Sequence, residues 1–493
     1  MKYIDATIEE VNTAMKEAHM AFLSYKNFPG KKKAEFLRAI ADEIEALDKE
    51  LVETAIHETN LPEARIINER GRTTSHCRMF ADLVEEGSWV EARVDTALPN
   101  RAPAPKPDIR KMLVPIGPVV VFGAANFPLA YSTAGGDTAS ALAAGCPVIV
   151  KAHPAHAGTS QLVAGAITKA IEKTGMPRGV FQHVHGAGFE VGQALVKHSF
   201  TKAVGFTGSL AGGKALFDLA NQRPEPIPVF AEMSSINPVI LLPETLQRDA
   251  EKTATIVAGS ITLGVGQFCT NPGLILAVEG EGLNRFINAL SAEIQKALPG
   301  TMLHQGIADN YSRKLTQALA QKGVKVEGHS SAEGNSSQGR PHVASVSGEA
   351  FMKNPALAEE VFGPFSLIVR CKSSDELNSV VNRSHGQLTA TIIGDEVELT
   401  KYSSLINTLV EKAGRLVVNG VPTGVEVCPS MQHGGPFPAT TDSRFSAVGT
   451  DAIKRFARPV AFQNFPDSIL PRELQENNPM NIWRLRNNEW IKK

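Results

Sequence analysis

The segment from residue 7 to residue 90 carries apolar side chains at helical spacing. Gly30 and the pair Leu61-Pro62 interrupt the pattern, because glycine and proline mark helix ends and turns. The aliphatic stripe between these breaks consists of Leu37, Ile40, Ile44, Leu47 and Leu51. The pattern predicts packed helices, and nothing in it indicates chemistry.

Residues 91–111 change to an extended pattern. Apolar and polar residues alternate up to Leu98 and are then interrupted by prolines at positions 99, 103, 105 and 107. Proline lacks the N–H that a central strand must donate. The segment is therefore predicted to be an arm or an edge strand, which could cross to another subunit.

From residue 112 onward, short apolar runs alternate with helical patterns. Strands are expected at residues 114–122, 147–151, 180–184, 203–206, 229–231 and 238–241. Helices are expected between them at residues 129–144, 159–173, 190–198 and 210–221. The second half repeats this alternation less regularly, with strands at residues 273–277, 365–369, 388–393 and 416–419. Such units build parallel sheets covered on both faces, so the fold class is α/β.

Polar residues follow several of these strands directly. They are Asn126, Lys151, Gly208-Ser209 and Glu232. Ligands of open parallel sheets bind at the carboxyl ends of the strands. We therefore expect these residues to lie near one another at a ligand site.

Composition excludes several classes of function. The chain has 493 residues, with 50 lysines and arginines against 51 acids, so nucleic acid and anionic membranes are not expected as partners. Its five cysteines form no metal-binding pairs and no disulfide framework. The acidic N-terminus is not a signal peptide, and no stretch is apolar enough to span a bilayer. We expect two or three domains in a cytoplasmic protein.

The stretch from Leu263 to Asn271 contains the most distinctive candidate, Cys269. Gly264 and Gly266 permit a close backbone approach to a ligand. Backbone N–H groups around the sulfur would suit a thiolate that attacks a carbonyl and holds the resulting oxyanion. The alternative is a buried core cysteine.

Two further candidates support carbonyl chemistry. Glu232 follows an apolar strand, and partial desolvation is expected to raise its pKa toward that of a useful base. The amide of Asn126 could donate to an oxyanion. The alternatives are a capping or ion-paired glutamate and a turn asparagine before Phe127-Pro128.

The remaining candidates could bind a nucleotide. Lys151 could contact a ribose or be solvated. Gly208 and Ser209 open a helix, whose N-terminus favours anions such as a pyrophosphate, although Ser209 could equally be a helix cap. Glu360 and Phe362, before Gly363-Pro364, could hold a ribose and a flat ring, or lie in an ordinary loop.

Taken together, these motifs resemble the aldehyde dehydrogenase superfamily along nearly the whole chain. The matching stretches are Pro115–Val119, Ala125–Pro128, Val148–Lys151, Gly205–Ser209, Glu232, Gly266–Cys269 and Glu360–Pro364. The resemblance implies two Rossmann-like parallel-sheet domains plus a small oligomerisation element. The cofactor domain would comprise residues 1–94 and 112–232, the catalytic domain residues 233–440, and the oligomerisation element residues 95–111 and 441–493.

The resemblance also implies a role for each candidate. Cys269 is the nucleophile, Asn126 and the Cys269 N–H form the oxyanion hole, and Glu232 activates the hydrolytic water. Lys151 contacts the adenosine ribose, and Gly208 and Ser209 lie beside the pyrophosphate. The nicotinamide ribose and ring would be held by Glu360 and Phe362. No metal is implied. The product is a carboxylate, formed through a thiohemiacetal and a thioester.

Three runs resemble one branch, the 2-oxoglutarate semialdehyde (2,5-dioxovalerate) dehydrogenases. They are Lys151–His156, Ala130–Asp137 and Gln432–Pro438. These enzymes are similar to an NADP-dependent fatty-aldehyde dehydrogenase, so that substrate class stays open. The implied assembly is a homodimer or homotetramer.

The chain departs from the family pattern in two places. The usual Gly-Gly-Lys after Glu232 is replaced by Ser234-Ser235-Ile236. The acid that usually follows Lys151 is missing, and Pro154 stands near its place. Loss of that acid favours NADP, with NAD accepted, although Glu190 could oppose a 2′-phosphate and no arginine is evident nearby.

Three other functions compete with a hydrolytic aldehyde dehydrogenase. A coenzyme A-acylating enzyme would usually lack the base, and a structural relative would lack the nucleophile, whereas Glu232 and Cys269 are both present. A cofactor-free cysteine hydrolase needs a histidine partner, and the sequence positions suggest none.

Overall fold

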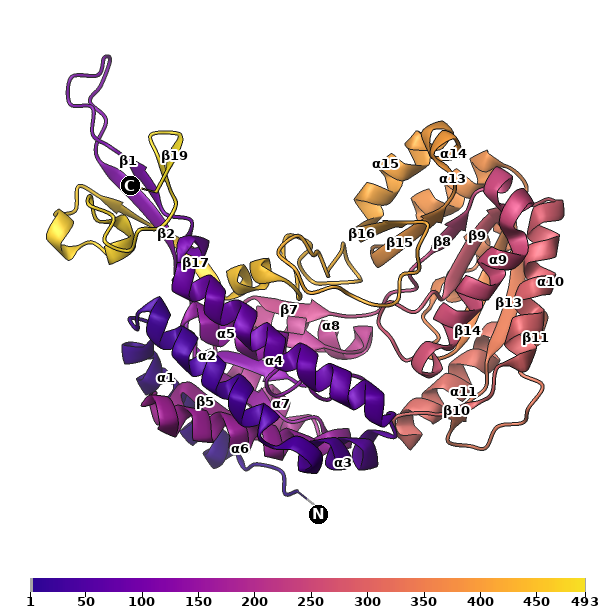
Figure 1. Cartoon of the computed structure of the whole chain (residues 1–493), viewed down its shortest axis with the longest axis horizontal. Helices are drawn as coiled ribbons and strands as arrows, with labels where there is room; N and C mark the ends of the chain where they lie inside the picture. The colour runs from indigo at the N-terminus through magenta and orange to yellow at the C-terminus, as the bar shows by residue number, and fades with distance from the viewer. Residues whose placement is uncertain (1–2, 493) are drawn as a thin grey trace.

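The computed structural model describes residues 3–492, and its N-terminal part is helical as predicted (Figure 1). Four helices, α1 (Ile8–Tyr25), α2 (Gly30–Glu45), α3 (Asp48–Thr59) and α4 (Glu63–Glu86), account for this part. Thr7 and Glu10 form a capping box at the start of α1. The aliphatic side chains of α2 are buried, and the helix packs against α4 and α6.

The first sheet has five parallel strands in the order β5-β4-β3-β6-β7. They are β3 (Val119–Phe122), β4 (Val148–Lys151), β5 (Phe181–Val184), β6 (Ala203–Thr207) and β7 (Val229–Glu232). Their connections contain α5 (Gly136–Ala144), α6 (Ala157–Thr174), α7 (Glu190–Lys197) and α8 (Leu210–Asn221). Because all five strands run in one direction, their carboxyl ends share one edge.

Two expected boundaries in this region were wrong. The strand expected at residues 114–122 is split into β2 (Ile109–Pro115) and β3, because Gly117 turns the chain with a φ of +127° and Pro118 follows it. The helix expected to begin at residue 129 begins at Gly136, since residues 129–135 form turns that place Gly136 N–H on Ala130 O.

The second sheet has seven strands in the order β11-β13-β14-β9-β8-β15-β16, all parallel except β11. The strands are β8 (Val239–Leu241), β9 (Leu274–Val278), β11 (Lys325–His329), β13 (His342–Ser347), β14 (Phe365–Cys371), β15 (Gln387–Ile393) and β16 (Ala413–Val418). A separate pair joins β10 (Gly300–Thr301) to β12 (Gln338–Gly339). Two such parallel-sheet units confirm the predicted fold class.

Helices cover the second sheet on both faces (Figure 1). They are α9 (Pro243–Thr262), α10 (Glu281–Lys296), α11 (Gln305–Leu319), α12 (Gly348–Lys353), α13 (Ser374–Arg383), α14 (Glu396–Lys401) and α15 (Ser403–Lys412). The C-terminus of α9 leads directly into the Cys269 stretch. None of the helices in residues 3–492 is both long enough and apolar enough to cross a membrane.

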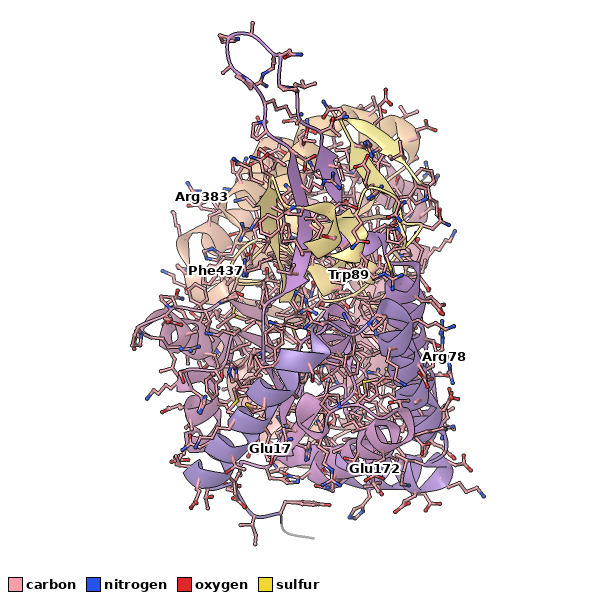
Figure 2. All side chains as sticks on the ribbon, turned by 90° about the vertical axis from the view of Figure 1, so that its left-hand side faces the viewer. Glu17, Arg78, Trp89, Glu172, Arg383 and Phe437 are labelled. Atoms are coloured by element: carbon pink, nitrogen blue, oxygen red, sulfur yellow. The ribbon has the colours of Figure 1, made fainter. Side chains whose placement is uncertain are left out.

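The third sheet stands apart from the other two (Figure 1), and Figure 2 shows the molecule from the side on which this sheet lies. Its order is β17-β2-β1-β18-β19, from β1 (Arg93–Asp95), β2, β17 (Ala457–Gln463), β18 (Arg484–Arg486) and β19 (Glu489–Ile491). The proline-rich residues lie between β1 and β2, in a loop that projects from the body. The segment expected to be an arm is thus an arm, while its role in assembly and the domain boundaries stay predictions.

A long segment without helices returns from the second sheet to the first. It follows β16 and runs to about residue 450 (Figure 1). Its residues pair with the end of β7: Met233 N–H donates to Ala439 O at 2.8 Å, and Thr441 N–H donates to Ala231 O at 3.1 Å. This return segment, residues 419–450, therefore lies beside Glu232.

Candidate active site

The Cys269 loop depends on its two glycines. Gly264 and Gly266 have φ values of +55° and +64°, in the left-handed region that favours glycine. A Cβ added at Gly266 would lie 2.3 Å from the backbone of Gly363. The second glycine thus allows the Cys269 loop to pack directly on the Gly363-Pro364 turn.

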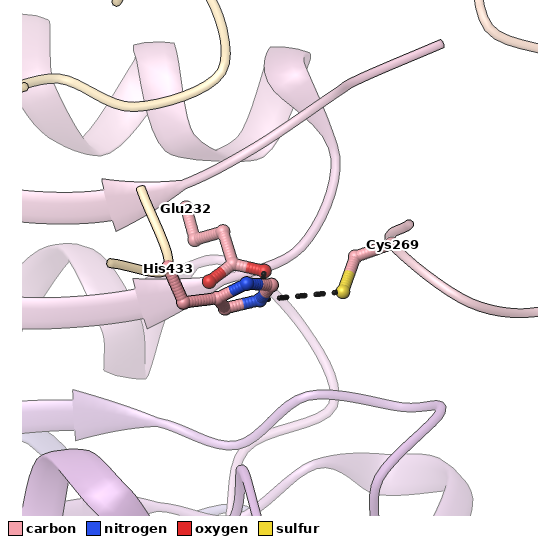
Figure 3. Close-up of side chains that lie close together, drawn as sticks. All are labelled: Glu232, Cys269 and His433. Atoms are coloured by element: carbon pink, nitrogen blue, oxygen red, sulfur yellow. Dashed lines mark hydrogen bonds and ion pairs between the residues drawn. The ribbon is translucent and has the colours of Figure 1, made fainter. Parts of the chain in front are cut away.

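Three reactive side chains converge at this loop (Figure 3). His433 Nε2 lies 3.6 Å from Cys269 Sγ and 3.1 Å from Glu232 Oε1. All three reactive atoms lie within 4.8 Å of one another. Glu232 and His433 are buried, and Cys269 is partly exposed. These are also ligand types that Zn²⁺ prefers, so such an ion would compete for the same atoms.

His433 is the residue that the sequence reasoning missed. The sequence positions suggested no histidine partner for Cys269, and the structure provides one, since residues 164 positions apart meet here. The return segment fixes His433 through its backbone: His433 N–H donates to Ser446 Oγ at 3.0 Å, and Ala447 N–H donates to His433 O at 2.8 Å. A Cβ at the nearby Gly435 would lie 2.1 Å from Gln387 O, so this segment packs closely on β15.

The electrostatics of the trio favour a protonated thiol beside an ionised carboxylate. Burial, with a further contribution from Glu232, raises the pKa of Cys269. Burial also acts to raise the pKa of Glu232, but the charge and hydrogen bond of His433 outweigh it, so the net shift is downward. The expected upward shift for Glu232 was therefore wrong. The ionised Glu232 carboxylate is therefore a proton acceptor near the Cys269 sulfur.

Asn126 lies at the Cys269 loop, as the prediction required. Its Nδ2 donates to Gln267 O at 3.1 Å. The neighbouring Phe127 packs its ring against Phe268, with centroids 5.8 Å apart. The amide is thus held beside the nucleophile, while its role in an oxyanion hole stays a prediction.

Asn237 is a second residue that the sequence did not mark, and it holds the backbone of the Cys269 loop in place. Its Nδ2 donates to Cys269 O at 2.8 Å and to Asn271 O at 2.9 Å. Asn237 is fully buried and adopts a φ of +45°, which asparagine tolerates better than most residues. No periodicity or motif in the sequence marks this residue.

The serines that replace the family's Gly-Gly-Lys have partners of their own. Ser234 Oγ donates to Glu360 Oε2 at 2.6 Å, and Ser235 Oγ donates to Gln387 Oε1 at 3.0 Å. Burial raises the pKa of Glu360 to about 7, although the Ser234 hydrogen bond opposes the shift. Ser234 therefore connects the segment after Glu232 to a candidate cofactor residue.

The other candidate cofactor residues are brought to two places. Lys151 ends β4, and Gly208 and Ser209 follow β6, so all three lie at the carboxyl edge of the first sheet. Ser209 Oγ accepts from Gly212 N–H at 3.2 Å as the cap of α8. Glu360 and Phe362 line a cavity that also reaches Gly266 and Asn271.

Comparison with known proteins gives one consistent result. The profile of the "Aldehyde dehydrogenase family" matches residues 1–451. Alpha-ketoglutaric semialdehyde dehydrogenase 2 of Azospirillum brasilense is 52% identical over 477 residues, covering 97% of this chain and 91% of that protein. Alpha-ketoglutaric semialdehyde dehydrogenase of Acinetobacter baylyi is 47% identical, covering 98% and 92% of the two chains.

A solved structure shows the same fold. The 1-pyrroline-5-carboxylate dehydrogenase from Thermus with bound NAD aligns with a TM-score of 0.76 at 21% identity, covering 93% of this chain and 86% of that one. The profile match and the two close relatives agree with the motifs found in the sequence. The chain therefore belongs to the aldehyde dehydrogenase family.

Proposed function

We propose that this chain oxidises 2,5-dioxovalerate to 2-oxoglutarate, with NADP as the preferred cofactor and NAD as a second one. The observation that carries the chemistry is the meeting of Cys269, His433 and Glu232 at one point. Two relatives that each share about half of the residues support the substrate, since both are named for this semialdehyde.

The first half of the reaction uses the trio as a proton acceptor. The Cys269 thiol gives its proton to the His433–Glu232 pair, and the sulfur then forms a C–S bond with the aldehyde carbon. The carbonyl electron pair moves to the oxygen, where the Asn126 amide and the Cys269 N–H stabilise the negative charge. When bound, the nicotinamide supplies a hydride acceptor. Loss of hydride from the adduct leaves a thioester on Cys269.

The second half of the reaction is hydrolysis. The proton taken up in the first half leaves to solvent, so Glu232 is again ionised. It then takes a proton from water, and the resulting hydroxide attacks the thioester carbon. The C–S bond breaks, the carboxylate leaves, and the sulfur departs as a thiolate. His433 lies close enough to donate a hydrogen bond to that thiolate and so supports its release.

The chain offers groups that fit the cofactor. Exposed backbone at Gly208 and Ser209 opens α8, a helix of 12 residues, and helix N-termini favour phosphate groups. Lys151 forms no ion pair within residues 3–492 and is partly buried, and burial lowers its pKa. Pro154 begins a short turn where an acid would oppose a 2′-phosphate, which supports NADP.

The third sheet supports assembly into a homodimer or homotetramer. Its side of the molecule exposes several large apolar side chains: Phe465, Ile469, Trp483 and Trp490. Clusters of exposed apolar residues commonly mark protein–protein contacts. Light scattering of the purified protein measures the mass, and a strictly monomeric protein would contradict this part of the proposal.

The experiment for the activity is a substrate panel. Purified protein is assayed with 2,5-dioxovalerate, glutarate semialdehyde, butanal and decanal, each with NADP and with NAD. We expect the largest kcat/KM for 2,5-dioxovalerate with NADP, and 2-oxoglutarate as the product. The Cys269→Ala variant should bind cofactor and lack turnover. A larger kcat/KM for decanal would instead support a fatty-aldehyde dehydrogenase.

A further inference from the structure

One face of α4 points charged side chains toward the Cys269 loop. Arg65, Glu69, Arg72 and His76 are spaced four, three and four residues apart, so they lie on one side of the helix. Opposite them stands an aromatic cluster formed by Phe127, Tyr131 and Phe268. Tyr131 in turn lies next to His433, with ring centroids 6.2 Å apart.

The positive charge of Arg65 is already paired with an acid, Glu69. Its Nε lies 3.5 Å from Glu69 Oε2, and its guanidinium lies 4.4 Å from the Phe127 ring and 4.7 Å from the Phe268 ring. The other oxygen of Glu69 accepts the backbone N–H groups of Leu129 and Ala130. This pair therefore has a structural task, namely to hold the turn that carries Asn126 and Phe127.

Arg72 has no such counter-charge. Its one hydrogen bond within residues 3–492 goes from Nη2 to the Tyr131 hydroxyl at 3.1 Å, and its Nε is buried without a partner. No carboxylate of this part of the chain lies within ion-pair distance of it. The neighbouring His76 is buried and its pKa is lowered to about 4, by burial and by Arg72, so His76 adds no charge of its own at neutral pH.

The positive charge of Arg72 reaches the nucleophile. It acts to lower the pKa of Cys269 and that of Tyr131, in each case against a larger effect of burial. Because the net pKa of Tyr131 is raised, its hydroxyl keeps its proton. Tyr131 accepts from Arg72 and can still donate to a ligand. The two residues thus form a donor pair next to the catalytic trio.

We propose that Arg72 and Tyr131 bind the carboxylate at the far end of the substrate. The inference rests on the proposed function and names the residues that select an oxo acid over a neutral aldehyde. A partly buried guanidinium without an acid is costly to desolvate, and a substrate carboxylate would supply the missing charge through charge-assisted hydrogen bonds. The aldehyde at the other end would then face Cys269.

Two other arginines fit this role less well. Arg415 donates to the carbonyl oxygens of Gly424 and Pro422, so it holds the return segment and contributes only its charge. Arg444 is exposed and forms an ion pair with Asp442 at 2.5 Å. Both terminal nitrogens of Arg415 are thus occupied and only its buried Nε has no partner in residues 3–492, whereas Nη1 of Arg72 makes no hydrogen bond within these residues.

The test compares two substrates on one variant. Arg72→Gln is assayed with 2,5-dioxovalerate and with butanal, using NADP. We expect kcat/KM for 2,5-dioxovalerate to fall about 30-fold or more, mainly through KM. For butanal the fall should be clearly smaller, because that substrate loses only the effect of the Arg72 charge on Cys269. Arg72→Lys should recover part of the loss, because it restores the charge without the planar donor geometry.

Arg70→Gln is the matched control. Arg70 lies on the same helix, but its guanidinium faces Asp48 at the start of α3, so both substrates should be unaffected. Equal losses for both substrates with Arg72→Gln would overturn the inference in favour of a structural role. Unchanged use of 2,5-dioxovalerate would overturn it outright. If the unsubstituted protein oxidises butanal and not 2,5-dioxovalerate, the proposed function itself fails.

Discussion

His433 lies between the nucleophile and its base, with Nε2 3.6 Å from Cys269 Sγ and 3.1 Å from Glu232 Oε1. One nitrogen serves both contacts, and the other ring nitrogen is buried without a partner in the described part of the chain. A proton can therefore leave the sulfur along a short route that ends on a buried carboxylate. Loss of the imidazole should leave a thiol whose pKa burial keeps high.

We predict that His433→Gln slows the reactions of the Cys269 thiol more than it weakens the binding of substrate. At pH 7 the rate of Cys269 alkylation by iodoacetamide should fall at least about tenfold, and kcat about 100-fold, the usual range for loss of a general acid–base group. The alkylation profile should move to higher pH. His329→Gln, at an exposed histidine, is the control. Normal alkylation in His433→Gln would show that Glu232 alone accepts the proton.

Replacement of Glu232 should separate the two halves of the reaction. The Glu232→Gln variant keeps a side chain of similar shape and loses the base. The first turnover should still transfer hydride, because His433 remains to accept the thiol proton, while thioester hydrolysis slows by a factor of about 100 or more. Stopped-flow absorbance should then show a burst of reduced cofactor close to one equivalent per active site. A slow first turnover without a burst would instead show that His433 does not accept the thiol proton without Glu232.

Glu360 should make cofactor binding sensitive to pH near neutrality. Burial raises the pKa of Glu360 to about 7, so the carboxyl ionises between pH 6 and pH 8. In the role proposed for Glu360, the ionised form would accept hydrogen bonds from the ribose hydroxyls, and the KM for the cofactor should therefore fall several-fold over that range as the pH rises. The contribution of Glu360 to the free energy of unfolding changes in the opposite direction to cofactor binding. Because the folded pKa of Glu360 is raised, this contribution is fully present below the unfolded pKa and is lost as the pH rises through about 7.

Glu360→Gln provides the comparison for this pH effect. The amide does not titrate, so the KM for the cofactor should be flat between pH 6 and pH 8. Ser234→Ala removes the hydroxyl that donates to Glu360 and should raise the pKa further, which shifts the KM transition to higher pH. An identical pH profile in all three proteins would assign the dependence to another group.

The sequence predicted the residues that follow regular strands. Lys151 and Glu232 each come directly after a short buried run, and a parallel sheet brings such positions to one edge. His433 could not be placed this way. It lies in the return segment, which has no periodic pattern, and its position depends on Gly435, which packs on β15. The sequence shows this glycine without showing what it approaches.

The same limit explains the two expectations about charge and local geometry. Desolvation of Glu232 could be foreseen from the strand before it, but the shift reversed because His433 is near. The Ser234-Ser235 replacement departs from the family pattern, and the sequence does not show what the two serines contact. The structure gives these serines partners in Glu360 and Gln387, both more than 120 positions away in the chain. Contacts of that range depend on the whole fold.

Asn237 should connect the stability of the fold to the position of the nucleophile. Asn237→Ala removes the donor for Cys269 O and Asn271 O and leaves both carbonyls without that donor, at a cost of about 2–4 kcal/mol in the free energy of unfolding. Urea denaturation measures this loss. Asn221→Ala, which removes an exposed bond to Phe217 O, should stay within about 0.5 kcal/mol. Because the lost bond is to the Cys269 carbonyl itself, kcat should fall as well. A stability loss without a fall in kcat would mean that the loop keeps its catalytic geometry without this anchor.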